Sequence, residues 1–155
     1  MKPKSFLLMV VLGSIIWIVF PLLFIWLNRF FNLPVIIFFP LQLLGGLLIN
    51  AALATIAYLF FLFRIHGEGT PVPIQPAKKV IRVGLYRYTR NPMYICHLVI
   101  ILSEWLLFGY TILLTYLFLL WLGFNWFVTA WEEPDLKKRL GKPYLEYLTR
   151  VPRWL

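Results

Sequence analysis

The sequence predicts an all-α integral membrane protein of about four transmembrane helices, with a loop and a C-terminal amphipathic helix gathered at one membrane face. The chain is 61% hydrophobic and only 14% charged, whereas soluble proteins are roughly 45–50% apolar and about 25% charged. Apolar runs recur along the chain, and Lys and Arg residues collect at one end of them. A core of 155 residues cannot hide this much apolar surface from water, so the surrounding solvent is expected to be lipid.

Four apolar runs account for most of the chain. A membrane helix needs about 20 mostly apolar residues. The first, second and fourth runs meet that length, and the third is shorter. Asn32-Leu33-Pro34 separates the first two runs, and Gly109-Tyr110 separates the last two. The expected spans are 5–27, 35–63, 93–108 and 111–131, within a single domain of residues 1–155.

The first run has a basic start, Met1-Lys2-Pro3-Lys4, which resembles the beginning of a signal peptide. Its apolar stretch is longer than the usual 7–15 residues, and no A-x-A cleavage pattern follows. A retained helix is therefore favoured over a cleaved signal.

Four spans with short turns place both termini and the long middle loop on the same side. Arg29 is the only one of the 15 Lys and Arg residues expected on the other side. This bias predicts that the basic side is cytoplasmic. The residues that carry it are Lys2, Lys4, Arg64, Lys78, Lys79, Arg82, Arg87, Arg90, Lys137, Lys138, Arg139, Lys142, Arg150 and Arg153.

The formal charge of +9 does not indicate a nucleic-acid partner, because the basic residues interrupt apolar spans and form no continuous soluble patch. A single cysteine, Cys96, excludes an internal disulfide and a cysteine-based zinc cluster. Three ligands cannot be assembled at metal-binding spacing, so no metal is expected.

The middle loop, residues 64–91, contains Gly67, Gly69 and three prolines, which exclude a long helix. One interpretation is a solvated linker whose basic residues touch lipid headgroups. Its content of Val, Ile, Leu and Tyr instead favours a segment that packs on the bundle.

The tail, residues 132–155, is predicted to form two helical pieces interrupted at Gly141 and Pro143. An apolar stripe recurs at three- and four-residue steps along it, at Leu136, Leu140, Tyr144, Tyr147, Leu148 and Val151. The tail is either an interfacial helix lying on the membrane or a lid that closes a site against the bundle, and the two are compatible.

Glu132 and Glu133 stand where the fourth span meets the basic side. With Asn125 and Thr129 they share a helix face at i, i+4, i+7 and i+8. Acids are unfavourable near a helix C-terminus, where the macrodipole is negative. The pair either marks the helix end beside nearby Arg or Lys residues or binds a ligand.

Other polar residues in the spans give weaker signals. His97 and Glu104 share one face of the third span, and Glu104 is near enough to the far end to reach the outer surface. Gly46, Asn50 and Ala54 step by four along the second span, which indicates a helix-packing face.

Four short motifs give the chain a resemblance to a known family. They are G-L-Y at residues 84–86, R-N-P-M-Y at 90–94, E-E-P-D-L at 132–136 and G-K-P-Y-L-E-Y at 141–147. Together they are similar to the membrane methyltransferases that include isoprenylcysteine carboxyl methyltransferase and the phospholipid methyltransferases, over residues 64–155. The resemblance implies S-adenosylmethionine as cofactor, held at the cytoplasmic ends of the last two spans.

The resemblance also implies roles for individual residues. Gly67 and Gly69 match a G-x-G of the phospholipid enzymes, and Glu132-Glu133 match their E-E. The implied cofactor-binding residues are Gly67, Gly69, Lys78, Lys79, Val80, Ile81, Tyr86, Asn91, Pro92, Met93, Tyr94, Glu132 and Glu133. The candidate catalytic residues are Glu132, Glu133 and Arg90, whose charge suits the cofactor carboxylate.

Two residues depart from the family pattern, and the second affects the expected substrate. Asn91 replaces a histidine common in the eukaryotic enzymes. Val128 replaces an arginine that contacts substrate in the isoprenylcysteine enzymes, which argues against prenylcysteine specificity.

The function implied by the resemblance is methyl transfer to a lipophilic acceptor, either an isoprenylcysteine-like carboxylate or a lipid headgroup, with the termini and the active site on the cytoplasmic side. The acceptor is expected to enter from the bilayer between the third and fourth spans. A carboxylate acceptor needs no base, whereas an amine does, and His97 is a candidate. The alternative is a small non-catalytic membrane protein that binds lipid or a partner. The oligomeric state stays open.

Overall fold

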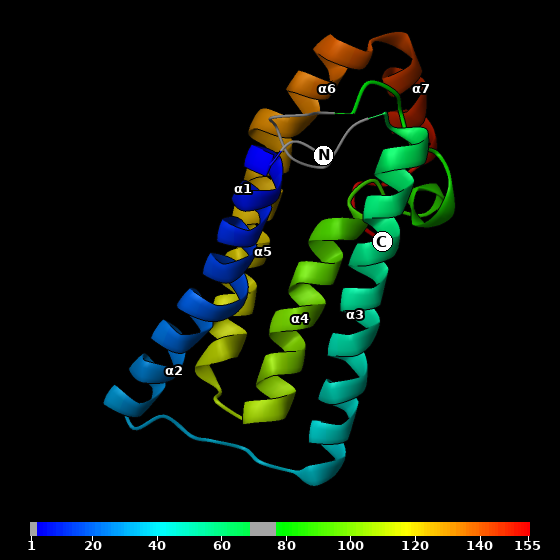
Figure 1. Ribbon diagram of the computed structural model, residues 1–155. Coiled ribbons are helices and arrows are strands. Elements are labelled where there is room, and N and C mark those ends of the chain that lie inside the picture. Colours follow the sequence, from blue (N-terminus) through cyan, green and yellow to red (C-terminus); the bar gives the residue numbers. More distant parts are fainter. Residues whose placement is uncertain (1–2, 69–76) are drawn as a thin grey trace.

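The computed structural model describes residues 3–68 and 77–155, and helices dominate both ranges (Figure 1). No β-strand occurs in these ranges, apart from one isolated antiparallel bridge between Val35 and Tyr110. The helical class predicted from composition is confirmed. Leu7–Phe30, Phe39–His66 and Ile112–Leu140 are long and apolar enough to cross a membrane, whereas the apolar helix Pro92–Phe108 is shorter. The crossing of the bilayer by this fourth helix remains a prediction.

The first span consists of α1 (Pro3–Ser14), a π-helical turn η1 (Ile15–Val19) and α2 (Phe20–Phe30), which follow one another directly. Pro21 explains the π-helical turn. Proline lacks an N–H and its ring collides with the carbonyl four residues earlier, so the chain widens by one residue just before it. In agreement, the Phe20 N–H donates to the Ile15 carbonyl, five residues back.

The second span is α3 (Phe39–His66), and its predicted limits were wrong at both ends. The helix starts at Phe39, not Val35, because the backbone before it bonds elsewhere. The Ile36 N–H donates to the Gly109 carbonyl at 2.9 Å, which ties this extended segment to the turn between α4 and α5. Pro40 then fits the first helical turn, where no N–H is needed.

The last two long helices are joined by a tight turn. α4 (Pro92–Phe108) ends at Gly109, whose φ of +74° a residue with a side chain rarely adopts. α5 (Ile112–Phe127) continues through a second π-helical turn, η3 (Val128–Glu132), into α6 (Glu133–Leu140). The helix therefore continues across the predicted boundary between span and tail at residue 132, and η3 accommodates Pro134 as η1 accommodates Pro21.

The tightest helix pair in the bundle is α3 with α4. Gly45 allows close approach, since a Cβ there would lie 2.9 Å from the Ser103 carbonyl oxygen. Leu59 and Ile100 are almost fully buried in one apolar cluster between the helices. The predicted packing face at Gly46 was wrong within this chain, because a Cβ on Gly46 meets nothing within 4 Å. The neighbouring face through Gly45 is the one that turns toward α4.

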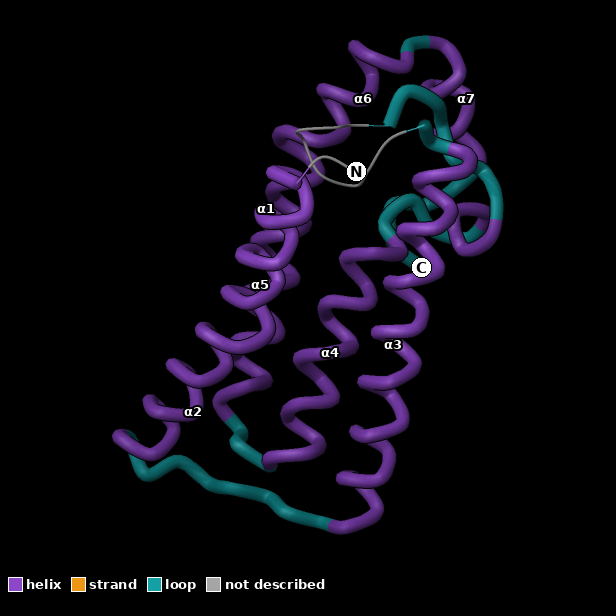
Figure 2. The backbone as a smooth tube through the Cα atoms, viewed as in Figure 1, coloured by secondary structure: helices purple, strands orange, loops and turns teal. Residues whose placement is uncertain are grey.

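The ends of the helices are arranged as the span pattern requires. The start of α1, the end of α3, α6 and α7 (Lys142–Arg150) all lie at one end of the bundle, at the top in Figure 1. The long loop between α2 and α3 lies at the opposite end, as the tube in Figure 2 shows. The basic segments are therefore collected at one end, and the site described next is built there.

Candidate functional site

The segment that follows the undescribed residues 69–76 packs onto the top of α3. Ile81 and Tyr86 are buried in the same apolar cluster as Leu59 and Leu62, which confirms that this part of the loop packs on the bundle. A short 3₁₀ turn, η2 (Gly84–Arg87), delivers Tyr86. Gly84 has a φ of +59°, and a Cβ on it would lie 2.5 Å from the Tyr58 hydroxyl oxygen. The glycine of G-L-Y is thus required by both backbone and space.

The tail covers this segment from the outside. It forms the two predicted helices, α6 and α7, with Gly141 between them. Tyr144, Tyr147 and Val151 of its predicted stripe are buried together, and the Tyr147 hydroxyl donates to the Tyr86 carbonyl at 2.7 Å. Burial raises the pKa of Tyr144 to about 12, so this ring stays neutral at physiological pH.

Glu133 is held by two arginines. Arg153 donates from Nε to Oε1 at 2.8 Å and from Nη2 to Oε2 at 3.0 Å, a two-pronged pair. Arg90 Nη1 lies 2.9 Å from the same Oε1, but without hydrogen-bond geometry, and Arg90 Nε is buried with no hydrogen-bond partner among the described residues. Arg153 of the tail thus binds both oxygens of Glu133. This agrees with the interpretation that the acid pair marks the helix end beside nearby Arg or Lys residues.

The last residues of the chain form a strap across the top of α4 and α5. The Arg153 carbonyl accepts from Asn91 Nδ2 at 2.9 Å and from the Thr89 hydroxyl at 3.0 Å. The Arg90 N–H donates to the Pro152 carbonyl at 3.0 Å. On the other helix, Trp154 Nε1 donates to Asn125 Oδ1 at 3.1 Å. This strap, Pro152–Trp154, links the beginning of α4 to the upper part of α5.

Glu132 points to a different group from its neighbour. Its Oε2 accepts the Tyr94 hydroxyl at 2.6 Å, and the Tyr94 ring lies 4.7 Å from the Phe124 ring, measured between centroids. Within the π-helical turn, the Thr129 hydroxyl donates back to the Asn125 carbonyl at 2.8 Å. The four polar residues predicted on one face therefore divide among separate partners: Asn125 with Trp154, Thr129 with its own helix, Glu132 with Tyr94 and Glu133 with the arginines.

The structure brings some of the predicted site residues together and leaves others apart. Arg90, Asn91, Tyr94 and the acid pair converge where α4 begins, with Pro92 and Met93 forming the first turn of that helix. The remaining predicted residues belong to the loop.

In the loop, Val80 packs under the tail and Ile81 in the bundle core. Lys79 is exposed and forms an ion pair with Glu68, and the Lys78 N–H donates to the Gly67 carbonyl. A Cβ on Gly67 would lie 2.9 Å from the Phe63 carbonyl oxygen, so chain packing accounts for this glycine. Gly69 lies outside the described residues.

The two weaker candidates on α4 also have defined surroundings. His97 Nδ1 accepts from Trp17 Nε1 at 3.1 Å. Glu104 is 7% exposed and its Oε2 has no partner among the described residues, so the expectation that it reaches the outer surface was wrong. Within the described residues, no three His, Cys, Asp or Glu side chains are grouped closely enough to hold a metal ion.

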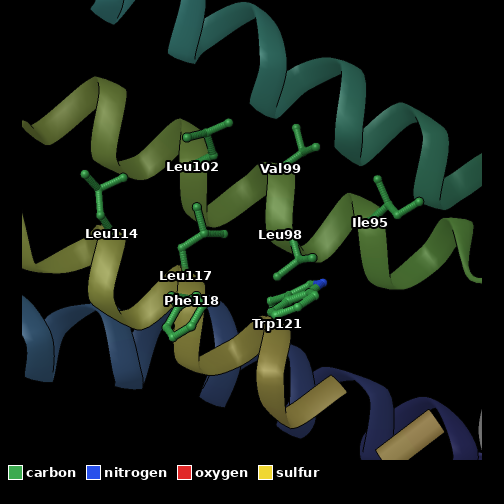
Figure 3. Close-up of a pocket in the computed structure, with 8 residues that line it drawn as sticks. All are labelled: Ile95, Leu98, Val99, Leu102, Leu114, Leu117, Phe118 and Trp121. Atoms are coloured by element: carbon green, nitrogen blue, oxygen red, sulfur yellow. The ribbon is translucent and has the colours of Figure 1, made fainter. Parts of the chain in front are cut away.

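An apolar groove of about 370 Å³ runs between α4 and α5 on their outer side (Figure 3). Ile95, Leu98 and Leu102 line it from α4, and Leu117, Phe118 and Trp121 from α5. All of these side chains are hydrocarbon or aromatic, so the groove suits a hydrocarbon chain of the bilayer.

Sequence reasoning did not single out Arg153, Thr89, Trp154 or Trp17 as site residues. The sequence did contain a signal for Arg153. An acid pair at the end of a span, followed by a basic tail, is expected to meet a cationic partner from that tail. Nothing in the sequence pairs Trp17 with His97, since the two are 80 positions apart and no periodicity relates separate helices.

Comparison with known proteins identifies the family of the chain. The sequence model of the family described as phospholipid methyltransferase matches residues 40–143, which include α3, α4, α5, the acid pair and the R-N-P-M-Y segment. No curated protein and no solved structure matches the chain. Because the family match spans the greater part of the chain, the protein belongs to the phospholipid methyltransferase family and is a membrane methyltransferase.

Proposed function

We propose that this protein transfers a methyl group from S-adenosylmethionine to a lipophilic acceptor at the end of the bundle where α4 begins. The observation that carries the proposal is the convergence of Tyr94, Arg90 and Glu132 inside the region matched by the family. These residues come from the two segments that the resemblance assigned to the cofactor, and the structure places them on neighbouring helices.

The residues present fit such a cofactor. The molecule carries a carboxylate, an amine, a ribose diol and a sulfonium cation. Arg90 Nε is a buried donor without a partner in the described part of the chain, and it suits the carboxylate. Glu132 has one oxygen bound by Tyr94 and a second that no described residue occupies, which suits the diol or the amine. The rings of Tyr94 and Phe124 offer π faces to a cation.

When bound, S-adenosylmethionine supplies a methyl group that a nucleophile takes by in-line displacement, breaking the carbon–sulfur bond as the new bond to the acceptor forms. The protein's contribution is to position and to exclude water. Tyr94 orients the Glu132 carboxylate through its hydroxyl. Glu133, engaged by Arg153, keeps the adjacent Arg90 in place. The tail covers the segment that carries Tyr86 and separates it from solvent.

The proposed orientation places the site at the cytoplasmic face of the membrane. Lys and Arg residues gather around the site end of the bundle, and cytoplasmic segments of membrane proteins carry this excess. The acceptor is proposed to be lipophilic because the site lies at the end of apolar spans, so a bilayer molecule reaches it without leaving the membrane.

Titration of S-adenosylmethionine into the detergent-purified protein tests the proposal. Wild-type protein is expected to bind, and Glu132→Gln is expected to weaken binding at least tenfold because the amide is uncharged and no longer complements a cationic ligand. Glu146→Gln, in the exposed part of the tail, is the matched control and should bind like wild type. Absence of binding by the wild-type protein would exclude the proposed cofactor.

A further inference from the structure

Two π-helical turns flank the same part of α4. η1 carries Trp17, whose Nε1 donates to His97, and η3 carries Glu132, which accepts from Tyr94. Tyr94 and His97 are one helical turn apart, and both rings lie against Phe124, at centroid distances of 4.7 and 5.9 Å. The imidazole of His97 is therefore the next polar group below the Tyr94–Glu132 pair on one face of α4.

The first span holds this imidazole in a defined state. The Tyr116 hydroxyl donates to the Ile16 carbonyl at 2.9 Å, which anchors η1 to α5. Trp17 then presents its N–H to His97 Nδ1 at 3.1 Å. Because Nδ1 accepts, the neutral ring carries its proton on Nε2. Nε2 donates to no described residue. It is also not one of the fully buried polar atoms that lack a hydrogen-bond partner among the described residues. It is thus a donor without a partner among the described residues.

On the side of α4 and α5 that faces away from the first span, the strap lies at the upper end of the apolar groove. The groove is lined by Ile95 on α4 and Trp121 on α5, and the next residues upward on these two stripes are Asn91 and Asn125. Both are bonded by the strap, Asn91 to the Arg153 carbonyl and Asn125 to the Trp154 indole. A lipid in the groove therefore meets the strap before it meets Glu132, contrary to the route expected from the sequence between the third and fourth spans.

We propose that His97, oriented by Trp17 of the first span, binds the polar head of the methyl acceptor through Nε2–H, and that the acceptor approaches from the first-span side of α4. This assignment rests on the proposed function. It requires that the polar head of the methyl acceptor carry an atom that accepts a hydrogen bond, such as a carboxylate or phosphate oxygen. His97 is then a hydrogen-bond donor, and not the general base considered from the sequence. Trp17, which lies outside residues 40–143, is a positioning residue.

The decisive experiment compares His97→Leu, His97→Gln and Trp17→Phe in proteoliposomes of total bacterial lipid extract, with transfer of a radiolabelled methyl group measured against lipid concentration. His97→Leu should raise the apparent KM for lipid about tenfold or more. His97→Gln should stay within about threefold, since its amide still donates but does not take up a proton. Trp126→Phe, a change at a 63% exposed indole, is the control and should match wild type.

Two results would overturn the inference: an unchanged KM in His97→Leu, or equal losses in His97→Leu and His97→Gln, which would indicate a base. A second readout needs no turnover. Nitrogen-15 NMR of histidine-labelled protein in detergent should show the Nε2–H tautomer of His97 in wild type and its partial loss in Trp17→Phe, whereas an Nδ1–H tautomer in wild type contradicts the assignment. Wild-type protein that binds no S-adenosylmethionine but shows the Nε2–H tautomer would remove the proposed function while leaving the Trp17–His97 geometry intact.

Discussion

Arg153 binds both carboxylate oxygens of Glu133. Arg153 lies three residues after the end of α7, and Glu133 is the first residue of α6. The pair joins the two ends of the tail, whose Tyr147 hydroxyl donates to the carbonyl of Tyr86 in the loop. Glu133 is 7% exposed, so the charge is largely removed from water and depends on its arginine partners.

Removing either partner should release the strap. Glu133→Gln and Arg153→Ala are each expected to destabilise the folded tail by about 2 kcal/mol, the typical worth of hydrogen bonds to a charged group. Hydrogen–deuterium exchange of peptides that cover residues 142–155 should rise strongly, with little change in α3. Arg150→Ala, on an exposed neighbouring arginine, is the control. Equal exchange in all three variants would show that the pair does not hold the tail.

Gly84 gives a second prediction, concerned with stability. Gly84→Ala places a Cβ at a φ of +59° and against the Tyr58 hydroxyl, and a cost of about 1–2 kcal/mol is expected from the backbone alone. The melting temperature in detergent should fall, and Tyr58→Phe should restore part of the loss by removing the colliding oxygen. Gly46→Ala, where nothing lies within 4 Å, should be neutral or stabilising. A Gly84→Ala protein as stable as wild type would contradict this explanation of the G-L-Y motif.

The orientation in the membrane can be read from single cysteines. Lys142→Cys in the tail and Phe31→Cys in the opposite loop are both exposed positions. A membrane-impermeant maleimide should label position 142 only in inverted vesicles and position 31 only in right-side-out vesicles. The native Cys96 is buried, so unmodified protein provides the background. The reverse pattern would place the basic end outside the cell.

Much of the fold was predictable because lipid imposes simple rules. Composition and run length gave the helical spans, and the interrupted apolar stripe gave the two tail helices around Gly141. The start of α3 was missed because Val35–Phe38 is as apolar as a span. Only the pairing of Ile36 with Gly109, a contact between distant segments, shows that this stretch is extended.

The site was predictable to a similar depth. The acid pair and Tyr94 were identified from motifs, but the separate partners, Tyr94 for Glu132 and Arg153 for Glu133, were not, and neither was the π-helical turn η3 in which Glu132 lies. The signal for such a turn is in the sequence, because each π-helical turn ends two residues before a proline, Pro21 or Pro134. The partners of Trp17 and Trp154 required the three-dimensional arrangement, since helix periodicity does not fix contacts between helices.

Methyl transfer in proteoliposomes is the most direct test of the central claim. Wild-type protein and the exposed-tail control Glu146→Gln should move radiolabel from S-adenosylmethionine into the lipid-soluble fraction at equal rates. Glu132→Gln should reduce the rate at least tenfold at subsaturating S-adenosylmethionine, because the uncharged amide binds the cationic cofactor more weakly although its oxygen can still accept the Tyr94 hydroxyl. Equal incorporation by Glu132→Gln and wild type, or none by wild type across total lipid extracts, would contradict the assignment of this site to methyl transfer.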